Sequence, residues 1–262
     1  MATPLQSSKE RLDRVLVSQG LATSREAAAR SILAGVVTVD GVHVDKPAKL
    51  ISPQANVQIE TGAPFVSRGG GKLAAALDCF GINVRGLTCL DVGCSTGGFT
   101  DCLLQRGARK VFGVDVGYGQ FDWRLRQDCR VVLLERTNIR YLHATALGDP
   151  IQLAVIDVSF ISLRLVLPNV VIFLHPGAEV VTLIKPQFEV GKGNVGAGGI
   201  VRDDAQREGV SKKVIDFAAG LGLDARGRMD CPVQGRKGNR EILVWFSYRS
   251  KMTDPSDMTS HT

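Results

Sequence analysis

A glycine-rich stretch at residues 91–100, Asp-Val-Gly-Cys-Ser-Thr-Gly-Gly-Phe-Thr, carries the clearest chemical pattern in the sequence. The apolar segment 87–92 leads into it, and residues 98–106 after it have the spacing of a helix. Glycines allow a ligand to approach the backbone closely, and the first turn of a helix offers N–H groups without partners. The pattern therefore predicts a ligand site where a strand passes through a tight turn into a helix.

Several cofactors compete for this turn. Dinucleotide-binding proteins use Gly-x-Gly-x-x-Gly and P-loops use Gly-x-x-x-x-Gly-Lys-Ser/Thr, whereas here the glycines are spaced Gly-x-x-x-Gly-Gly with no following lysine. The pattern Asp-x-Gly-x-x-x-Gly-Gly suits S-adenosylmethionine, whose ammonium group Asp91 could hold. Asp115, at the end of the next apolar segment, could accept hydrogen bonds from both ribose hydroxyls of an adenosine. The candidate cofactor-binding residues are Asp91, Gly93, Ser95, Thr96, Gly97, Gly98, Phe99, Asp115, Asn138 and Asp157.

Two other interpretations of the turn stay open. Residues 93–97 also fit the Gly-x-Ser-x-Gly nucleophile elbow of α/β-hydrolases, with Ser95 as the nucleophile. That chemistry needs an aspartate and then a histidine later in the chain, and the only late histidine, His261, is one residue from the end. The remaining interpretation is a glycine-rich turn that binds nothing.

A second group of charged residues lies at the ends of later apolar segments. Asp157 ends one such segment and Lys185 ends the next, so they are adjacent if the two strands are neighbours. Lys72, before the first strand, and Glu241, at the start of a late strand, complete the group. Each residue alone is most often a solvated charge. A lone aspartate at 157, instead of an Asn/Asp-Pro-Pro-aromatic or Pro-Cys motif, favours a hydroxyl over an amine or a cytosine carbon as the methyl acceptor.

The elements that must position these residues alternate between strand and helix. After a helix at 71–80, the expected strands and helices follow one another, and such alternation is typical of a mostly parallel, doubly wound α/β sheet. Ligands of that fold bind at the carboxyl ends of the strands. The expected strands are 87–92, 110–115, 130–134, 152–158, 179–185, 223–231 and 241–248, and the later helices are 98–106 and 204–220.

Residues before about 61 have a different organisation. Leu12, Val15 and Leu16 have helical spacing, and Ser24 and Gly35 are suited to begin and end a second helix. Valines then alternate around Asp40-Gly41, which indicates a type I′ hairpin. Two helices and a hairpin predict a small α+β module at residues 9–61, joined by a linker at 62–67 to a domain at 68–248 and a mobile polar tail at 249–262.

Several stretches together resemble the TlyA family of ribosomal-RNA ribose 2′-O-methyltransferases, members of which have been labelled hemolysins. The stretches are 65–73, 91–108, 185–189, 190–203 and 231–243. The resemblance implies a Rossmann-like, FtsJ-like methyltransferase domain that uses S-adenosylmethionine. Residues 11–60 resemble the RNA-binding module of that family, which is named for a small-subunit ribosomal protein. Cys94, where alanine is expected, and Gly71 depart from the usual pattern, but both keep a small residue.

The resemblance also implies a catalytic Lys-Asp-Lys-Glu tetrad, carried here by Lys72, Asp157, Lys185 and Glu241. Transfer of a methyl group to a ribose 2′-oxygen needs an aligned pair of reactants and removal of the hydroxyl proton. Lys185 is the expected base. The two carboxylates raise the pKa of a lysine, whereas a like charge at Lys72 and desolvation by bound RNA lower it. We therefore expect Lys185 to be neutral only in the closed complex.

The excess of positive charge, +6 over the 262 residues, is unevenly distributed. Residues 1–62 hold only one positive charge more than negative charges, and the rest of the chain holds the remaining five. RNA binding by the module would then depend on gathering its basic residues on one face. A cluster at 226–240, opposed by Asp230 alone, would hold phosphates near the target ribose. The candidate RNA-binding residues are Arg11, Arg14, Arg25, Arg30, Lys46, Lys49, Arg68, Arg226, Arg228, Arg236, Lys237 and Arg240.

Composition excludes several classes of protein. The hydrophobic fraction of 44% is too high for intrinsic disorder, and no apolar run approaches the roughly 20 residues of a membrane span. The six cysteines have no Cys-x-x-Cys spacing, so we expect no metal site, and we expect a cytoplasmic protein without a secretory signal. A membrane-lytic hemolysin is disfavoured for the same reasons. The non-enzymatic alternative is a ribosome-assembly factor that keeps the cofactor pocket with little activity.

Overall fold

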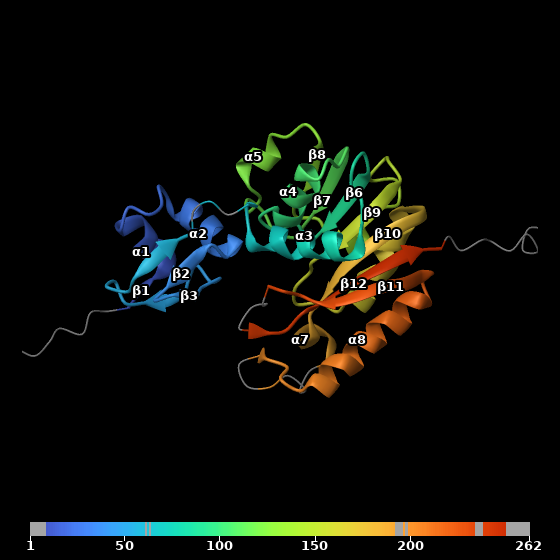
Figure 1. Ribbon diagram of the computed structural model, residues 1–262. Helices are drawn as coiled ribbons and strands as arrows, with labels where there is room; N and C mark the ends of the chain where they lie inside the picture. Colours follow the sequence, from blue (N-terminus) through green and yellow to red (C-terminus); the bar gives the residue numbers. More distant parts are fainter. Residues whose placement is uncertain are drawn as a thin grey trace, which may run out of the picture.

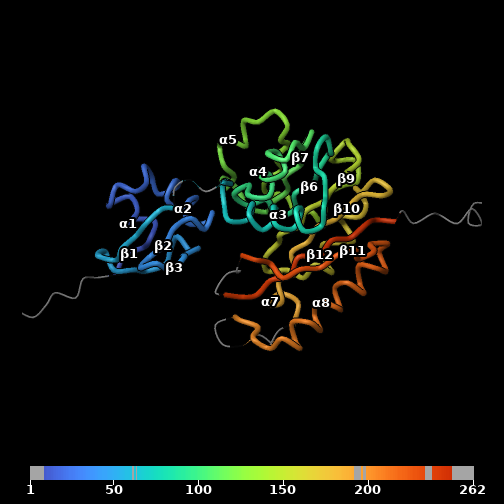
Figure 2. Tube along the Cα trace, in the orientation of Figure 1, coloured from blue at the N-terminus to red at the C-terminus, as the bar shows by residue number. Residues whose placement is uncertain are grey.

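An N-terminal module and a larger α/β domain lie side by side in the computed structural model of the protein (Figure 1). The structure describes residues 9–60, 62, 64–191, 196, 199–233 and 238–249. The module lies beside the start of helix α3 (Arg68–Phe80), which runs across the α/β domain (Figure 2). No helix in these described ranges is long and apolar enough to cross a membrane.

The module contains the two expected helices and the expected hairpin. Asp40 and Gly41 both have positive φ values, 51° and 78°, which a type I′ turn requires, so the hairpin prediction is confirmed. Val37, Val39 and Val44 of the hairpin region, together with Leu12, Leu16 and Ile32, belong to a core of the module's own. Three very short strands, β1, β4 and β5, were not expected. The elements are β1 (Glu10–Arg11), α1 (Leu12–Ser18), α2 (Arg25–Ala34), β2 (Val37–Val39), β3 (Val42–His43), β4 (Leu50–Ile51) and β5 (Val57–Ile59).

A seven-stranded sheet forms the centre of the α/β domain, in the order β11-β12-β10-β9-β6-β7-β8. Its strands β6 to β10 are parallel, and β12 and β11 are antiparallel additions at one edge. The prediction of a mostly parallel α/β sheet is therefore confirmed. The strands are β6 (Thr88–Val92), β7 (Lys110–Val114), β8 (Val131–Leu134), β9 (Ile151–Ile156), β10 (Leu174–Ile184), β11 (Leu223–Asp230) and β12 (Ile242–Tyr248).

Burial on both faces explains why the central strands of the sheet are mostly apolar. β6 is buried at all five positions, because helices cover both sides of a parallel sheet. Helices α3 and α4 lie on one side, and α8 runs along the β11–β12 edge (Figure 1). The helices are α3 (Arg68–Phe80), α4 (Gly98–Gln105), α5 (Trp123–Arg126), α6 (Leu167–Val170), α7 (Pro186–Glu189) and α8 (Asp204–Ala219).

Two elements begin earlier than the sequence predicted. α3 begins at Arg68, with Ser67 as its N-cap, although its glycines at 69–71 suggested a start at residue 71. The earlier start places Arg68 and Lys72 one turn apart on the same helix. β10 begins at Leu174 and crosses a shift in register before Glu179, where the polar His175-Pro176-Gly177 had hidden the strand.

Candidate active site

A cavity of about 410 Å³ opens at the carboxyl ends of β6, β9 and β10. Its walls come from the glycine turn before α4, from the start of α3, from the ends of β9 and β10, and from the residues before β12. The N-terminal module adds a further wall. Small-molecule sites commonly have volumes of roughly 300–1,000 Å³. The cavity is therefore large enough for a cofactor and lies where this fold places its ligands.

Sheet register and helix α3 together bring the four tetrad residues to this cavity. Asp157 follows Ile156, which is aligned with Thr182 of β10. Lys185 follows Ile184, and Ile184 is paired with Ile242, the residue after Glu241. Strands that are neighbours in the sheet thus present Asp157, Lys185 and Glu241 at one edge, and α3 adds Lys72.

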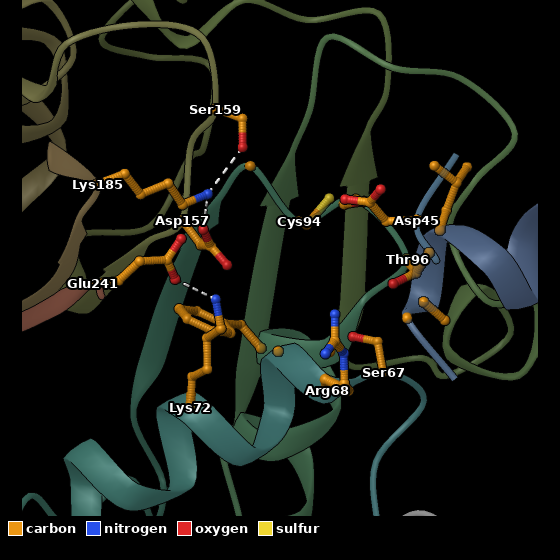
Figure 3. Close-up of a pocket in the computed structure, with 18 of the residues that line it drawn as sticks. Asp45, Ser67, Arg68, Lys72, Cys94, Thr96, Asp157, Ser159, Lys185 and Glu241 are labelled. Atoms are coloured by element: carbon orange, nitrogen blue, oxygen red, sulfur yellow. Dashed lines mark hydrogen bonds and ion pairs between the residues drawn. The ribbon is translucent and has the colours of Figure 1, made fainter. Parts of the chain in front are cut away.

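The four side chains form two lysine–carboxylate pairs (Figure 3). Lys72 Nζ lies 2.5 Å from Glu241 Oε2, and Lys185 Nζ lies 2.5 Å from Asp157 Oδ1. Lys185 also donates a hydrogen bond of 2.9 Å to Ser159 Oγ. The structure therefore brings together the four residues that the sequence analysis grouped, and it adds Ser159 as a partner of Lys185.

Burial makes the charges of these pairs interdependent. The Glu241 side chain is only 2% exposed and that of Lys72 12% exposed. Burial lowers the pKa of Lys72, but the nearby charges of Asp157 and Glu241 outweigh it, so that the pKa is raised above its usual range. Lys72 is thus held as a cation, which suits a residue that orients partners and not one that accepts a proton.

The glycine turn approaches the tetrad closely. A Cβ on Gly93, whose φ is +84°, would lie 2.6 Å from the carbonyl oxygen of Asp157. Only glycine allows this contact, because the obstructing atom belongs to the backbone. Ser95 N donates a hydrogen bond of 2.8 Å to Asp115 Oδ2, which fixes the turn to the end of β7.

Most of the candidate cofactor residues line the cavity, but four do not. Gly93, Ser95, Thr96, Gly98, Phe99 and Asp157 contribute to its wall, together with Cys94. Gly97 is the N-cap of α4, and Asp115 accepts hydrogen bonds from the backbone at Ser95 and Gly117. Asn138 caps a short 3₁₀ turn by accepting a hydrogen bond from Arg140 N. The fourth, Asp91, is described next.

Asp91 is fully buried beneath the glycine turn. Its Oδ2 accepts a hydrogen bond of 2.6 Å from Thr100 Oγ1, which connects β6 to α4. Its Oδ1 is buried without a hydrogen-bond partner among the described residues. Burial, opposed by the Thr100 hydrogen bond, raises the pKa of Asp91 to about 7. The structure thus gives Asp91 a role in fixing the turn, one layer behind the cavity wall.

Two aromatic side chains at the cavity were missed by the sequence analysis. Phe160 is 80% exposed, and its φ of 66° lies in the left-handed region, which bulky residues rarely adopt. Its ring lies 5.2 Å from the ring of Phe188, and both residues line the cavity. An exposed ring held in a strained backbone is available for stacking on a planar ligand. The motif after Asp157 gave no signal for this conformation.

The basic residues of the module are less uniform than expected. Arg11 and Arg25 both pair with Asp13, at 2.7 and 3.4 Å. Asp13 lies in the first turn of α1 and is only 3% exposed. Lys46 lines the cavity between the module and the α/β domain. The exposed residues Arg14 and Lys49 and the partly exposed Arg30 complete the set.

Ion pairs engage part of the basic cluster at 226–240. The expectation that Asp230 alone opposes it is wrong, because α8 supplies Asp204 and Glu208. Arg228 makes two hydrogen bonds to Glu208, and Arg240 contacts both Asp204 and Asp230. Arg226 donates to Ser247 Oγ. Arg236 and Lys237 lie outside the described residues.

The geometry does not support a serine hydrolase. Ser95 lies in the turn with a φ of 48°, but no histidine is among the described residues that line the cavity. Across the described ranges of the chain, no three histidine, cysteine, aspartate or glutamate side chains gather as a metal site would require.

Comparison with known proteins identifies the family. Residues 65–248 match the profile of FtsJ-like methyltransferases, and residues 10–57 match the S4 domain. The chain belongs to the FtsJ-like methyltransferase family. The resemblance found in the sequence and the expected fold class are therefore both confirmed. Within this FtsJ-like chain, the S4 match covers most of the N-terminal module.

Characterised and solved relatives extend along most of this FtsJ-like chain. The 16S/23S rRNA (cytidine-2′-O)-methyltransferase TlyA of Mycobacterium tuberculosis is 48% identical over 240 residues, 91% of this chain and 90% of that protein. A candidate rRNA methyltransferase of Bacillus subtilis, YqxC, is also 48% identical, over 91% of this chain and 85% of its own length. The structure of a candidate hemolysin from Streptococcus thermophilus has a TM-score of 0.73 at 41% identity, covering 93% of this chain and 90% of that one.

Proposed function

We propose that this protein transfers a methyl group from S-adenosylmethionine to the 2′-oxygen of a cytidine ribose in ribosomal RNA. The observation that carries the proposal is the juxtaposition of two lysine–carboxylate pairs with a glycine turn in one cavity. The named activity of the TlyA relative, at 48% identity over nine-tenths of both chains, supports the substrate class.

The residues of the cavity fit S-adenosylmethionine. The glycine turn admits a ligand against its backbone, and two helix N-termini, those of α3 and α4, meet beside it. Gly93, Ser95, Thr96, Gly98 and Phe99 would line the cofactor, with Asp157 at its reactive end. When bound, the cofactor supplies an electrophilic methyl group on a sulfonium.

Lys185 is the residue that we assign to the 2′-hydroxyl proton. In the free protein its ammonium is engaged by Asp157 and Ser159, so it must lose a proton before it can act as a base. Bound RNA would exclude water from the mouth of the cavity, and desolvation disfavours the charged form of a lysine. Lys72, held as a cation by Glu241, would orient the ribose and the catalytic base Lys185 through charge-assisted hydrogen bonds.

RNA would reach the cavity from both parts of the chain. The S4 module offers Arg14, Lys49 and Arg30, with Arg11 and Arg25 held by Asp13. Arg68, Arg226, Arg228 and Arg240 lie on the methyltransferase domain, and Arg236 and Lys237 complete the proposed contacts. The Phe160–Phe188 pair is suited to stack on the base of the target nucleotide.

The test is methyl transfer to purified ribosomal subunits. Small and large subunits without the modification are incubated separately with the protein and S-adenosylmethionine labelled in its methyl group. A methylated 2′-oxygen blocks alkaline cleavage of the adjacent phosphodiester, so the label should appear in an alkali-resistant dinucleotide that contains cytidine. Lys212→Ala, which changes an exposed lysine on α8, is the matched control for Lys185→Ala.

The outcomes separate the proposed enzyme from its alternative. Label in a methylated base, or none in RNA from either subunit, would contradict the proposal. Tight binding to a subunit without methyl transfer would indicate a ribosome-assembly factor.

A further inference from the structure

The end of helix α2 in the S4 module lies against the start of helix α3. Gly35 ends α2 with a φ of +76°, and a Cβ at this position would lie 2.5 Å from Arg68 Nε and 3.0 Å from Arg68 Nη2. The guanidinium of Arg68 therefore occupies the place of the missing side chain. The last carbonyl groups of a helix carry partial negative charge, which suits a cation at this point.

The same part of the module forms a wall of the cavity. Leu33, Ala34 and Gly35 from the end of α2, with Asp45 and Lys46 from the segment after β3, line it together with the glycine turn and the tetrad. Ala34 is only 8% exposed although it is the last residue of helix α2. Asp45 lies on the side of Cys94 and Thr96, away from the Lys72–Glu241 pair (Figure 3). The module thus faces the cofactor side of the cavity.

Helix α3 connects this contact to the tetrad. Arg68 and Lys72 are four residues apart, so their side chains lie on one face of the helix, and both line the cavity. A change in how the module lies against Arg68 therefore acts on the helix that carries Lys72.

We propose that the docked S4 module is part of the cofactor site and that the Gly35–Arg68 contact holds the module in its docked position. This inference rests on the proposed function, because it assumes that the cavity binds S-adenosylmethionine. It adds that module residues Gly35 and Asp45 set the affinity for the cofactor in the absence of RNA. Because coupling between two binding events is reciprocal, RNA that holds the module in its docked position strengthens cofactor binding, and cofactor strengthens RNA binding by the same factor.

The first test compares two glycines of the module in the full-length chain. Gly35→Ala and Gly20→Ala both place a side chain at a positive φ, +76° and +71°, but only the first meets Arg68, whereas nothing lies within 4 Å of the second. Isothermal titration with S-adenosylhomocysteine should give a higher dissociation constant for Gly35→Ala, because the guanidinium of Arg68 must move, and an unchanged one for Gly20→Ala. Circular dichroism and thermal unfolding of both variants would establish that they are folded.

A double-mutant cycle distinguishes loss of the Gly35–Arg68 contact from damage to the fold of the module. Arg68→Ala removes the side chain that the methyl group introduced by Gly35→Ala would strike. If Gly35→Ala acts through Arg68, it should have little further effect on S-adenosylhomocysteine binding in the Arg68→Ala background. If Gly35→Ala changes the dissociation constant by the same factor in both backgrounds, the proposed role of the Gly35–Arg68 contact would be contradicted.

The second test measures the coupling itself. The affinity for the ribosomal subunit that accepts methyl groups is measured with and without saturating S-adenosylhomocysteine. The wild type should bind the subunit more tightly with the ligand, and Gly35→Ala should lose most of that gain. Equal S-adenosylhomocysteine affinity in wild type and Gly35→Ala would overturn the inference while leaving the proposed function intact. A wild type that binds no S-adenosylhomocysteine would contradict the proposed function itself.

Discussion

Lys185 and Lys72 differ in their partners, and this difference assigns them different tasks. Lys72 faces a carboxylate that is almost fully buried, whereas Lys185 faces Asp157, whose side chain is 20% exposed, and the hydroxyl of Ser159. The pair that includes Lys185 is thus the one that an arriving substrate can more easily rearrange. A group that must change its protonation during a reaction is best placed in such a pair.

Replacement of Lys185 should therefore affect the chemical step alone. Because general-base catalysis contributes roughly 10²- to 10⁴-fold, Lys185→Ala should slow single-turnover methyl transfer by a factor in this range. Binding of S-adenosylhomocysteine, measured by titration calorimetry, should change less than about threefold, since the glycine turn is untouched. Near-normal turnover in Lys185→Ala would remove Lys185 from the role of base.

Asp91 should give the protein a measurable dependence of stability on pH. Its pKa is raised from an ordinary 3.8 to about 7 by burial. Between these values the unfolded chain releases the proton and the folded chain retains it, so stability is lost as the pH rises from 4 to 7. At about 1.4 kcal/mol for each pH unit, the loss is at most on the order of 4 kcal/mol.

Asp91→Asn should remove this dependence while keeping an oxygen to accept the Thr100 hydrogen bond. Urea unfolding at pH 4, 5.5 and 7 should show wild type losing stability relative to Asp91→Asn as the pH rises. Asp78→Asn is the matched control: Asp78 is exposed beside Arg106, which lowers its pKa, so any effect should be small and opposite in sign. A difference between wild type and Asp91→Asn that is the same at every pH would contradict the assignment.

At the scale of helices and strands, the features that could be predicted from the sequence are those that depend on the local pattern of apolar and charged residues. Apolar runs and strand-end charges predicted that Asp157 and Lys185 would be adjacent, because the carboxyl ends of parallel strands meet at one edge of the sheet. The pairings of Arg228 and Arg240 with α8 were not predictable, because they join residues 20 and 36 positions apart through a tertiary contact. The strained backbone at Phe160 and the early start of α3 also depend on packing, for which a single sequence has no signal.

The ion pairs between α8 and β11 hold the strand that leads to Glu241. Arg207, only 6% exposed, contacts Asp230 at 3.0 Å and Asp204 at 3.3 Å, and Arg240 contacts the same two carboxylates. Asp230 is paired with Ile242 in the sheet, and Cys231 N donates to the carbonyl of Glu241 at 2.9 Å. These contacts fix the backbone on both sides of Glu241.

Asp230→Ala should therefore impair both stability and catalysis. The substitution leaves the buried Arg207 with one carboxylate partner, Asp204, in place of two. Because Asp230 is half-exposed, we expect a loss of about 1–3 kcal/mol in the free energy of unfolding. Displacement of Glu241 should lower the rate of methyl transfer by up to about 100-fold. Asp216→Ala, which removes an exposed partner of Lys212 on the same helix, should change stability by less than about 0.5 kcal/mol. Equal effects of the two variants would show that the network does not position Glu241.

At the scale of the whole molecule, a net charge of +6 overstates the charge that is available to RNA at some sites and understates it at others. The methyltransferase domain has most of the excess, but Arg228 and Arg240 are engaged by carboxylates of α8. The module is nearly neutral, yet the described ion pairs do not include its Arg14 or Lys49. Charge counted along the sequence therefore differs from charge available on the surface.

This distribution predicts how RNA binding should respond to salt. Each phosphate contact adds roughly 0.7–0.9 to the slope of log affinity against log salt concentration, because it releases counterions. Arg14→Gln with Lys49→Gln should therefore reduce the slope for the accepting ribosomal subunit by about 1.4–1.8. Arg228→Gln should reduce it by much less, because RNA must first break two hydrogen bonds to Glu208. A slope that falls as far for Arg228→Gln as for one module variant would mean that RNA displaces Glu208, and that the charges of α8 rearrange when the substrate binds.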